Sequence, residues 1–150
     1  GVGMKVVAFD PFIEKATVGL RFFDGQKRDF NIETISKEAV LEQADFLSLH
    51  VPAQDTYVIG TKEFNMMKTG AGIVNAARGG VIDEKSLIMS IEDGKISNEA
   101  LDVFENETSP EINLLMNRNI SLTPHIGAAT QEAQDRIGEE LASQIIEIMA

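Results

Sequence analysis

The sequence predicts an α/β fold built on a doubly wound parallel sheet. Short runs rich in β-branched and aromatic residues alternate along the chain with segments of helical periodicity, which is typical of βαβ units with right-handed crossovers. Most of these runs are continuously apolar rather than alternating, which indicates strands covered on both faces. We expect strands at residues 5–9, 46–51, 72–76, 100–104 and 119–122.

The helices between these strands have recognisable start and stop signals. A side chain that can accept a hydrogen bond from the first helical turn lies at each expected start. The start signals are Ser36, Thr61, Asp83 and Thr130, and glycines mark two of the ends, Gly70 and Gly94. The last helix is the longest and is predicted to be amphipathic, with its apolar positions at Ala133, Ile137, Leu141, Ile145 and Ile148.

Residues 18–33 interrupt the alternation of strands and helices. The pair Asp24-Gly25 is a turn signal, and it lies between Phe22-Phe23 and Phe30-Asn31-Ile32. This segment is therefore predicted to form either a small hairpin or a surface loop.

The composition indicates one globular domain with a strongly acidic surface. The chain has 150 residues, of which 43% are hydrophobic and 25% charged, and its formal net charge is −11. These proportions are those of ordinary folded domains. So acidic a surface repels phosphate groups, which argues against nucleic acid and anionic membranes as partners.

The residue inventory narrows the chemistry further. The chain has no cysteine, which excludes disulfides, iron–sulfur clusters and thiolate zinc sites, and its two histidines are far apart, so we expect no metal site. No apolar run approaches the ~18–20 residues that span a bilayer and no signal peptide opens the chain, so we expect a cytoplasmic protein. The chain begins at Gly1 without Met and is interpreted as a piece of a longer protein.

Ligands bind at the carboxyl ends of the strands in open α/β sheets. Asp10 follows the first expected strand, where a carboxylate can accept hydrogen bonds from ribose hydroxyls and repel a 2′-phosphate; it can also serve simply as a turn residue. The glycine-rich phosphate loop that should precede such a strand is absent, because Gly1-Val2-Gly3 comes before a strand instead of after one. We therefore expect that loop upstream of Gly1.

Two further strand ends carry reactive side chains. Arg78 is followed by two glycines, which let a ligand approach the backbone while the guanidinium binds a carboxylate. His125 follows the last expected strand and needs an acceptor to orient it as an acid or base. The acids after the neighbouring strand are candidates for that acceptor, and the sequence does not choose among Glu105, Glu107 and Glu111.

Taken together, five segments of the chain resemble the signatures of the D-2-hydroxyacid dehydrogenase family. They follow one another with the family's spacing, at residues 8–11, 44–52, 72–83, 100–104 and 124–128. The resemblance implies a Rossmann-like NAD-binding domain over residues 1–150, incomplete on its N-terminal side, where the first strand and the glycine-rich loop would lie. The family's substrate domain would then lie outside this chain.

The resemblance also implies roles for single residues. Arg78 matches the substrate-binding arginine, His125 the general acid/base, and Glu107 its carboxylate partner, although Thr108 follows where the family usually has proline. His50 matches a residue with a structural role. The residues expected to bind NAD are Asp10, Val51, Ala76, Ala77, Arg78, Asp102, His125, Gly127 and Ala128.

The activity implied is hydride transfer between NAD and C2 of a D-2-hydroxy acid, so the partner is a small 2-hydroxy or 2-oxo acid. The stretch from His125 to Glu140 favours 3-phospho-D-glycerate, oxidised in serine biosynthesis. A hydroxypyruvate or glyoxylate reductase of the same family and an NAD-sensing, corepressor-like binding module are the alternatives. We expect the full-length protein to be a homo-oligomer, a dimer or tetramer, and residues 1–150 alone to be inactive.

Overall fold

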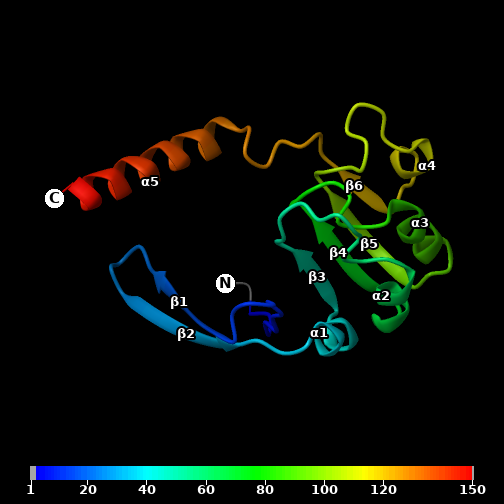
Figure 1. The fold of residues 1–150 in the computed structure, drawn as a ribbon, viewed down its shortest axis with the longest axis horizontal. Helices are drawn as coiled ribbons and strands as arrows, with labels where there is room; N and C mark the ends of the chain where they lie inside the picture. The colour runs from blue at the N-terminus through cyan, green and yellow to red at the C-terminus, as the bar shows by residue number, and fades with distance from the viewer. Residues whose placement is uncertain (1–2, 150) are drawn as a thin grey trace.

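The computed structural model, which describes residues 3–149, places four parallel strands in one sheet (Figure 1). The strands lie in the order β3-β4-β5-β6, so the predicted α/β fold with a parallel sheet is confirmed. Their bounds are Phe46–Leu49 for β3, Ala71–Asn75 for β4, Ile96–Leu101 for β5 and Ile120–Leu122 for β6. The strand expected at 46–51 thus ends at Leu49, where the chain turns into a loop. The strand expected at 100–104 is displaced and runs from Ile96 to Leu101, because residues 96–99 pair with β4 although their sequence Ile-Ser-Asn-Glu is largely polar.

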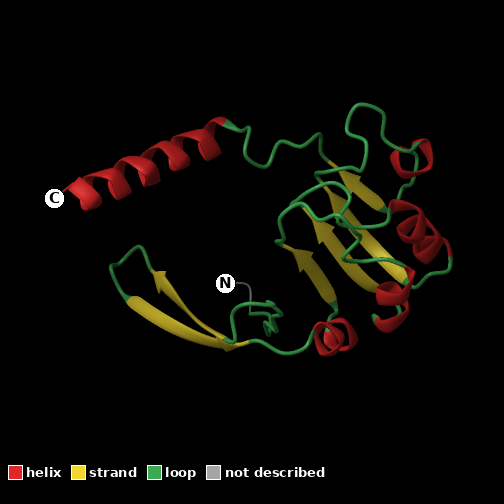
Figure 2. Ribbon diagram, in the orientation of Figure 1, coloured by secondary structure: helices red, strands yellow, loops and turns green. Residues whose placement is uncertain are grey.

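Helices connect these strands and cover one face of the sheet (Figure 2). The connecting helices are α1 (Lys37–Gln43), α2 (Thr61–Met66), α3 (Glu84–Glu92) and α4 (Ile112–Leu115). The core lies between these helices and the sheet. It contains the strand residues Leu47, Ile73 and Leu101 and the helix residues Phe64, Leu87 and Leu114.

The second face of the sheet is open within the described residues. Phe46 is 64% exposed and Val74 is 38% exposed; Phe46 pairs with Gly72 and Val74 with Ser48, so both lie on the face opposite Leu47 and Ile73. The expectation that both faces are covered is therefore wrong for this part of the chain. A continuously apolar run indicates that a strand is suited to burial, but it does not indicate which segment covers the strand.

The local helix signals are confirmed at Ser36, Asp83 and Thr130, but the N-cap of α2 is Gly60, and Thr61 is the first residue of that helix with its hydroxyl bonded to Ser86. The Ser36 side chain accepts a hydrogen bond from the Ala39 amide at the start of α1, and Asp83 accepts from the Lys85 and Ser86 amides at the start of α3. Gly94 follows α3 with a φ of 69°, a conformation that residues with side chains rarely adopt.

The segment before α1 lacks the strand expected at residues 5–9, but it contains the hairpin that was one of two alternatives for residues 18–33. Residues 5–9 do not form a strand; Ala8 makes a single isolated bridge to Thr34, because no neighbouring strand offers the other backbone groups a partner. The hairpin predicted as one alternative is present as β1 (Lys15–Arg21) and β2 (Lys27–Glu33), which pair antiparallel around the Asp24-Gly25 turn.

The last helix, α5 (Gln131–Met149), begins after Thr130 as predicted and projects away from the sheet (Figure 1). Its apolar stripe contacts no core: Ile137 is 45% and Ile145 60% exposed. Neither α5 nor any other helix within residues 3–149 is both long and apolar enough to cross a bilayer.

Candidate active site

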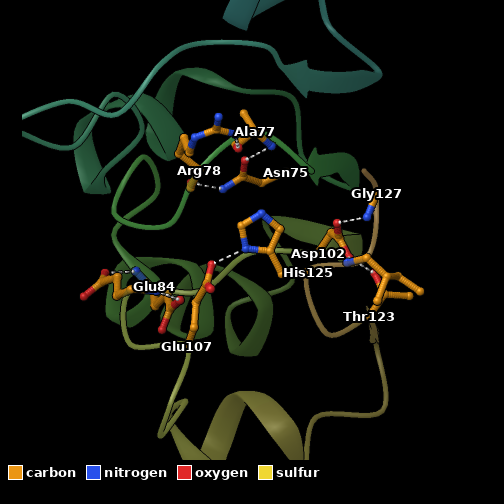
Figure 3. Close-up of polar contacts among 11 residues, drawn as sticks. Asn75, Ala77, Arg78, Glu84, Asp102, Glu107, Thr123, His125 and Gly127 are labelled. Carbon is orange, nitrogen blue, oxygen red and sulfur yellow. Dashed lines mark hydrogen bonds and ion pairs between the residues drawn. The ribbon is translucent and has the colours of Figure 1, made fainter. Parts of the chain in front are cut away.

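The carboxyl ends of β4, β5 and β6 bring together three loops that carry the predicted catalytic side chains (Figure 3). Arg78 follows β4, Glu107 follows β5 and His125 follows β6. These strands are neighbours in a parallel sheet, so all three ends lie along the same edge.

His125 and Glu107 form a direct pair. The imidazole Nδ1 lies 2.6 Å from Glu107 Oε1, and both side chains are a little under half exposed. A carboxylate in this position fixes the orientation of the ring and favours a proton on Nδ1, which leaves Nε2 free to act on a ligand.

The structure distinguishes among the three acids that the sequence left open. Glu105 accepts a hydrogen bond from the Glu84 amide at 3.0 Å, while its own amide donates to Glu84 Oε1 at 2.7 Å. Glu111 precedes α4 as its N-cap residue. Of the three, only Glu107 has a recorded hydrogen bond to His125.

The reciprocal Glu84–Glu105 contact also fixes the loop that carries Glu107. Glu84 is buried, and this burial raises the pKa of its carboxyl group; the hydrogen bond from the Glu105 amide opposes the shift, while the Glu105 and Glu111 charges add to it. The contact ties the loop after β5 to the first turn of α3.

The loop of Arg78 is organised by a residue to which sequence reasoning gave no role. Asn75 is 3% exposed; its Oδ1 accepts from the Ala77 amide and its Nδ2 donates to the Arg78 carbonyl, both at 3.1 Å. The Arg78 side chain is exposed and donates to the Ala77 carbonyl. The sequence did contain a signal for this role, because Asn75 has an amide side chain and is the last residue of an otherwise apolar strand.

Gly79 brings this loop against the loop that carries Glu107. A Cβ atom at position 79 would lie 1.9 Å from the carbonyl oxygen of Phe104, so only glycine allows the two backbones this close approach.

Asp102 is also buried, at 8% exposure, and holds the loop that carries His125. Its carboxylate accepts hydrogen bonds from the Thr123 hydroxyl and from the Ile126 and Gly127 amides. Burial alone would raise the pKa of this carboxyl group, but these hydrogen bonds and the nearby His125 hold the pKa below its usual value.

The remaining predicted cofactor residues divide between positions away from this cluster and positions on its own loops. Asp10 Oδ1 accepts from the Phe12 and Ile13 amides at 2.8 and 3.0 Å, so Asp10 forms the turn that was its alternative interpretation. Val51 is half-buried against the core, and His50 Nε2 lies 2.9 Å from the Ser48 hydroxyl. The other residues lie on the loops after β4 and β6, namely Ala76, Ala77, Gly127 and Ala128.

A cavity of about 270 Å³ opens beside the His125–Glu107 pair. Its other walls are largely apolar and come from Phe104, Pro110, Leu115, Leu122 and Pro124. Within residues 3–149, no group of three or more His, Asp or Glu side chains is arranged to hold a metal ion.

Comparison with protein families and solved structures identifies what this arrangement resembles. Residues 1–127 match the model of the D-isomer specific 2-hydroxyacid dehydrogenase NAD-binding domain. The D-3-phosphoglycerate dehydrogenase of Methanocaldococcus jannaschii is 40% identical over 152 residues, covering 98% of this chain and 27% of that protein. The hydroxypyruvate reductase of Thermotoga maritima is 39% identical over 148 residues, covering 95% of this chain and 44% of that protein.

Solved structures agree with this assignment. A glyoxylate reductase from Paecilomyes thermophila has a TM-score of 0.67 at 40% identity, over 77% of this chain and 34% of that one. A D-lactate dehydrogenase from Aquifex aeolicus, solved with NAD and lactic acid, has a TM-score of 0.64 at 29% identity, over 79% of this chain and 41% of that one. The chain spans about a quarter of the length of the phosphoglycerate dehydrogenases it matches.

Proposed function

The chain belongs to the D-isomer specific 2-hydroxyacid dehydrogenase family, as its NAD-binding domain, and from this premise we propose that the protein oxidises 3-phospho-D-glycerate to 3-phosphohydroxypyruvate. The observation that carries the proposal is the 2.6 Å contact between His125 Nδ1 and Glu107 at the strand ends that also hold Arg78. This set supplies a proton acceptor, a charge that stabilises the protonated ring, and a cation for the substrate carboxylate.

The residues present fit NAD as the cofactor. Within residues 3–149, the turn amides of Phe12 and Ile13 donate to Oδ1 of the Asp10 carboxylate and not to Oδ2. Oδ2 is therefore left to accept a hydrogen bond from a ribose hydroxyl. A carboxylate there disfavours a 2′-phosphate, so we propose a preference for NAD over NADP. The other proposed contacts are Val51, Ala76, Ala77, Arg78, Asp102, His125, Gly127 and Ala128. When bound, NAD supplies the acceptor for the hydride that leaves C2 of the substrate.

The chain's own residues perform the remaining steps. The Arg78 guanidinium binds the substrate carboxylate and fixes the position of C2. His125 Nε2 takes the proton of the C2 hydroxyl as the C2–H bond breaks, so that the oxygen becomes a carbonyl. The Glu107 carboxylate, on the other ring nitrogen, stabilises the imidazolium that results.

A reductase acting on hydroxypyruvate or glyoxylate is the second candidate. It is favoured by the hydroxypyruvate reductase and glyoxylate reductase relatives, and it would use the same three side chains in the reverse direction.

Steady-state kinetics of the full-length protein test the proposal. We expect kcat/KM for 3-phospho-D-glycerate with NAD to exceed the values for D-glycerate and glycolate, and NAD to be preferred over NADP. A higher kcat/KM for hydroxypyruvate or glyoxylate than for 3-phosphohydroxypyruvate would favour the reductase. No turnover with any of these acids would refute both candidates.

A further inference from the structure

One buried carboxylate contacts the chain on both sides of His125. Asp102 Oδ1 accepts from the Thr123 hydroxyl at 2.6 Å and from the Ile126 amide at 2.9 Å. Oδ2 accepts from the Gly127 amide at 2.9 Å (Figure 3). The donors thus lie two residues before His125 and one and two residues after it.

His125 itself has an unusual backbone conformation. Its φ is 53°, and it is the only residue other than glycine with positive φ in the described part of the chain. Residues with a Cβ atom disfavour this left-handed region, and they stay there when the surrounding structure holds them. The hydrogen bonds to Asp102 hold the chain on both sides of residue 125, because they fix the backbone immediately after it and the side chain of Thr123 before it. They act beside the bond from the Thr123 amide to the Leu101 carbonyl and the contact between His125 and Glu107.

Asp102 is itself anchored in the centre of the sheet. Its amide donates to the Asn75 carbonyl at 2.9 Å, so its position follows that of β4 and β5. Gly127 leaves room for the carboxylate, since a Cβ atom there would lie 3.1 Å from Oδ2. The position of the His125 loop is therefore fixed relative to the same strands that carry the Arg78 loop.

We propose that Asp102 is a positioning residue: its carboxylate holds residues 123–127 in the conformation that brings His125 Nδ1 to Glu107. This inference rests on the proposed function insofar as His125 transfers the substrate proton. It is separate from the NAD contact proposed above for the same residue, because it acts through the protein backbone and is present without cofactor.

Asp102→Asn in the full-length protein tests the inference. Asparagine keeps the size of the side chain and one acceptor oxygen. Its NH2 group takes the place of Oδ2, and because this group is itself a donor it cannot accept from the Gly127 amide. Loss of hydrogen bonds to a charged group predicts a fall in kcat of about tenfold or more. We expect the KM for the hydroxy acid to stay within about twofold, because Asn75 holds the Arg78 loop independently.

Amide hydrogen exchange at Ile126 and Gly127 gives a readout that does not depend on turnover. We expect faster exchange at both amides in Asp102→Asn, with or without NAD. Thr123→Val removes one of the three donors, should fold, and should show a smaller change of the same kind. The matched control is Glu99→Gln, which changes another buried carboxyl on β5 that has no hydrogen-bond partner; it should leave exchange and kcat unchanged.

The outcomes separate the possibilities. Unchanged exchange at Ile126 and Gly127 in both variants would overturn the inference, and so would a loss of NAD affinity alone, which would assign Asp102 to the cofactor only. If the unmutated protein oxidises no 2-hydroxy acid while Asp102→Asn still accelerates exchange, the proposed function fails and the holding of the loop stands.

Discussion

The contact between Glu107 and His125 has a consequence for the rate of turnover. Glu107→Gln keeps the size of the side chain but removes the carboxylate, so the imidazole loses its charge-assisted hydrogen bond. We expect kcat to fall by about tenfold or more in oxidation of the hydroxy acid and in reduction of the 2-oxo acid, because both directions use the same ring. Steady-state kinetics of the two proteins in both directions measure the fall.

Glu105→Gln is the control for that experiment. Glu105 accepts from the Glu84 amide at the start of α3, and glutamine keeps an acceptor oxygen there, so this substitution should leave kcat unchanged in both directions. An unchanged kcat in Glu107→Gln would remove Glu107 as the partner.

Arg78→Lys tests the geometry of substrate binding. A lysine ammonium keeps the charge but not the planar fork that binds a carboxylate through two hydrogen bonds. A charged hydrogen bond contributes about 1.5–3 kcal/mol, so we expect kcat/KM to fall at least about tenfold while the unfolding transition stays in place. Near-normal kinetics would reduce Arg78 to an exposed residue at a strand end.

Glu99 is a buried carboxyl group that the proposed mechanism does not use. It is 4% exposed, both its oxygens lack hydrogen-bond partners, and burial raises its pKa to about 7. The folded state therefore holds a proton that the unfolded chain releases at lower pH. The protein should lose stability as pH rises from the unfolded value of about 4.3 to about 7, by up to about 3 kcal/mol.

Denaturant unfolding of Glu99→Met measures this effect. The variant should be more stable than the unmutated protein, and the difference should be larger at pH 8 than at pH 5. A difference independent of pH would mean that Glu99 ionises at the same pH in the folded and unfolded states.

At this scale the sequence predicted where the proposed site residues lie better than it predicted their contacts. Arg78 and His125 follow apolar strands, which sequence alone reveals. Residue chemistry left three acids open as the partner of His125 and only the family resemblance selected Glu107, which the structure places against the imidazole. The supporting role of Asn75 depends on a turn after β4, a property of tertiary structure that residue spacing does not show.

Among the elements, α3 has the most extensively bonded start. Asp83 accepts from the Lys85 and Ser86 amides and from the Ser86 hydroxyl. Asp83→Ala should destabilise the protein by about 1–2 kcal/mol, the upper part of the range for N-cap residues. Ser36→Ala removes a single 3.2 Å contact at α1 and should cost less in the same denaturant titration. Equal losses would show that the extra bonds at α3 contribute nothing.

Helix starts were predictable because capping is local, involving side chains and amides within three residues of each other. Strands 46–49 and 71–75 were predictable because the neighbouring strands with which they pair are present in the chain. Residues 5–9 are similarly rich in apolar residues, yet Val6 is 66% exposed because a strand requires partners that its own sequence cannot supply. The hairpin was recognisable from Asp24-Gly25, but only the structure distinguished it from a loop.

The molecule as a whole divides into a packed part and two projecting elements. β3–β6 and α1–α4 share one core, whereas α5 has no buried residue and β1 and β2 are almost entirely exposed. A helix whose apolar face packs on nothing lacks the tertiary contacts that supply most helical stability in proteins, and isolated two-stranded hairpins are marginally stable in water. In residues 1–150 alone, amides of α5 and of the hairpin should therefore exchange much faster than those of β4 and β5. Hydrogen exchange with mass spectrometry tests this, and uniform protection would contradict it.

The close approach of Gly79 to Phe104 joins two parts of the site mechanically. The backbone beside Arg78 rests directly on the carbonyl that begins the Glu107 loop, and that loop is fastened in turn to the first turn of α3. A displacement of α3 should consequently shift the backbones of both loops together. A residue larger than glycine at position 79 would push those backbones apart, so the spacing between the proposed substrate-binding arginine and the proposed partner of His125 depends on a position that carries no side chain.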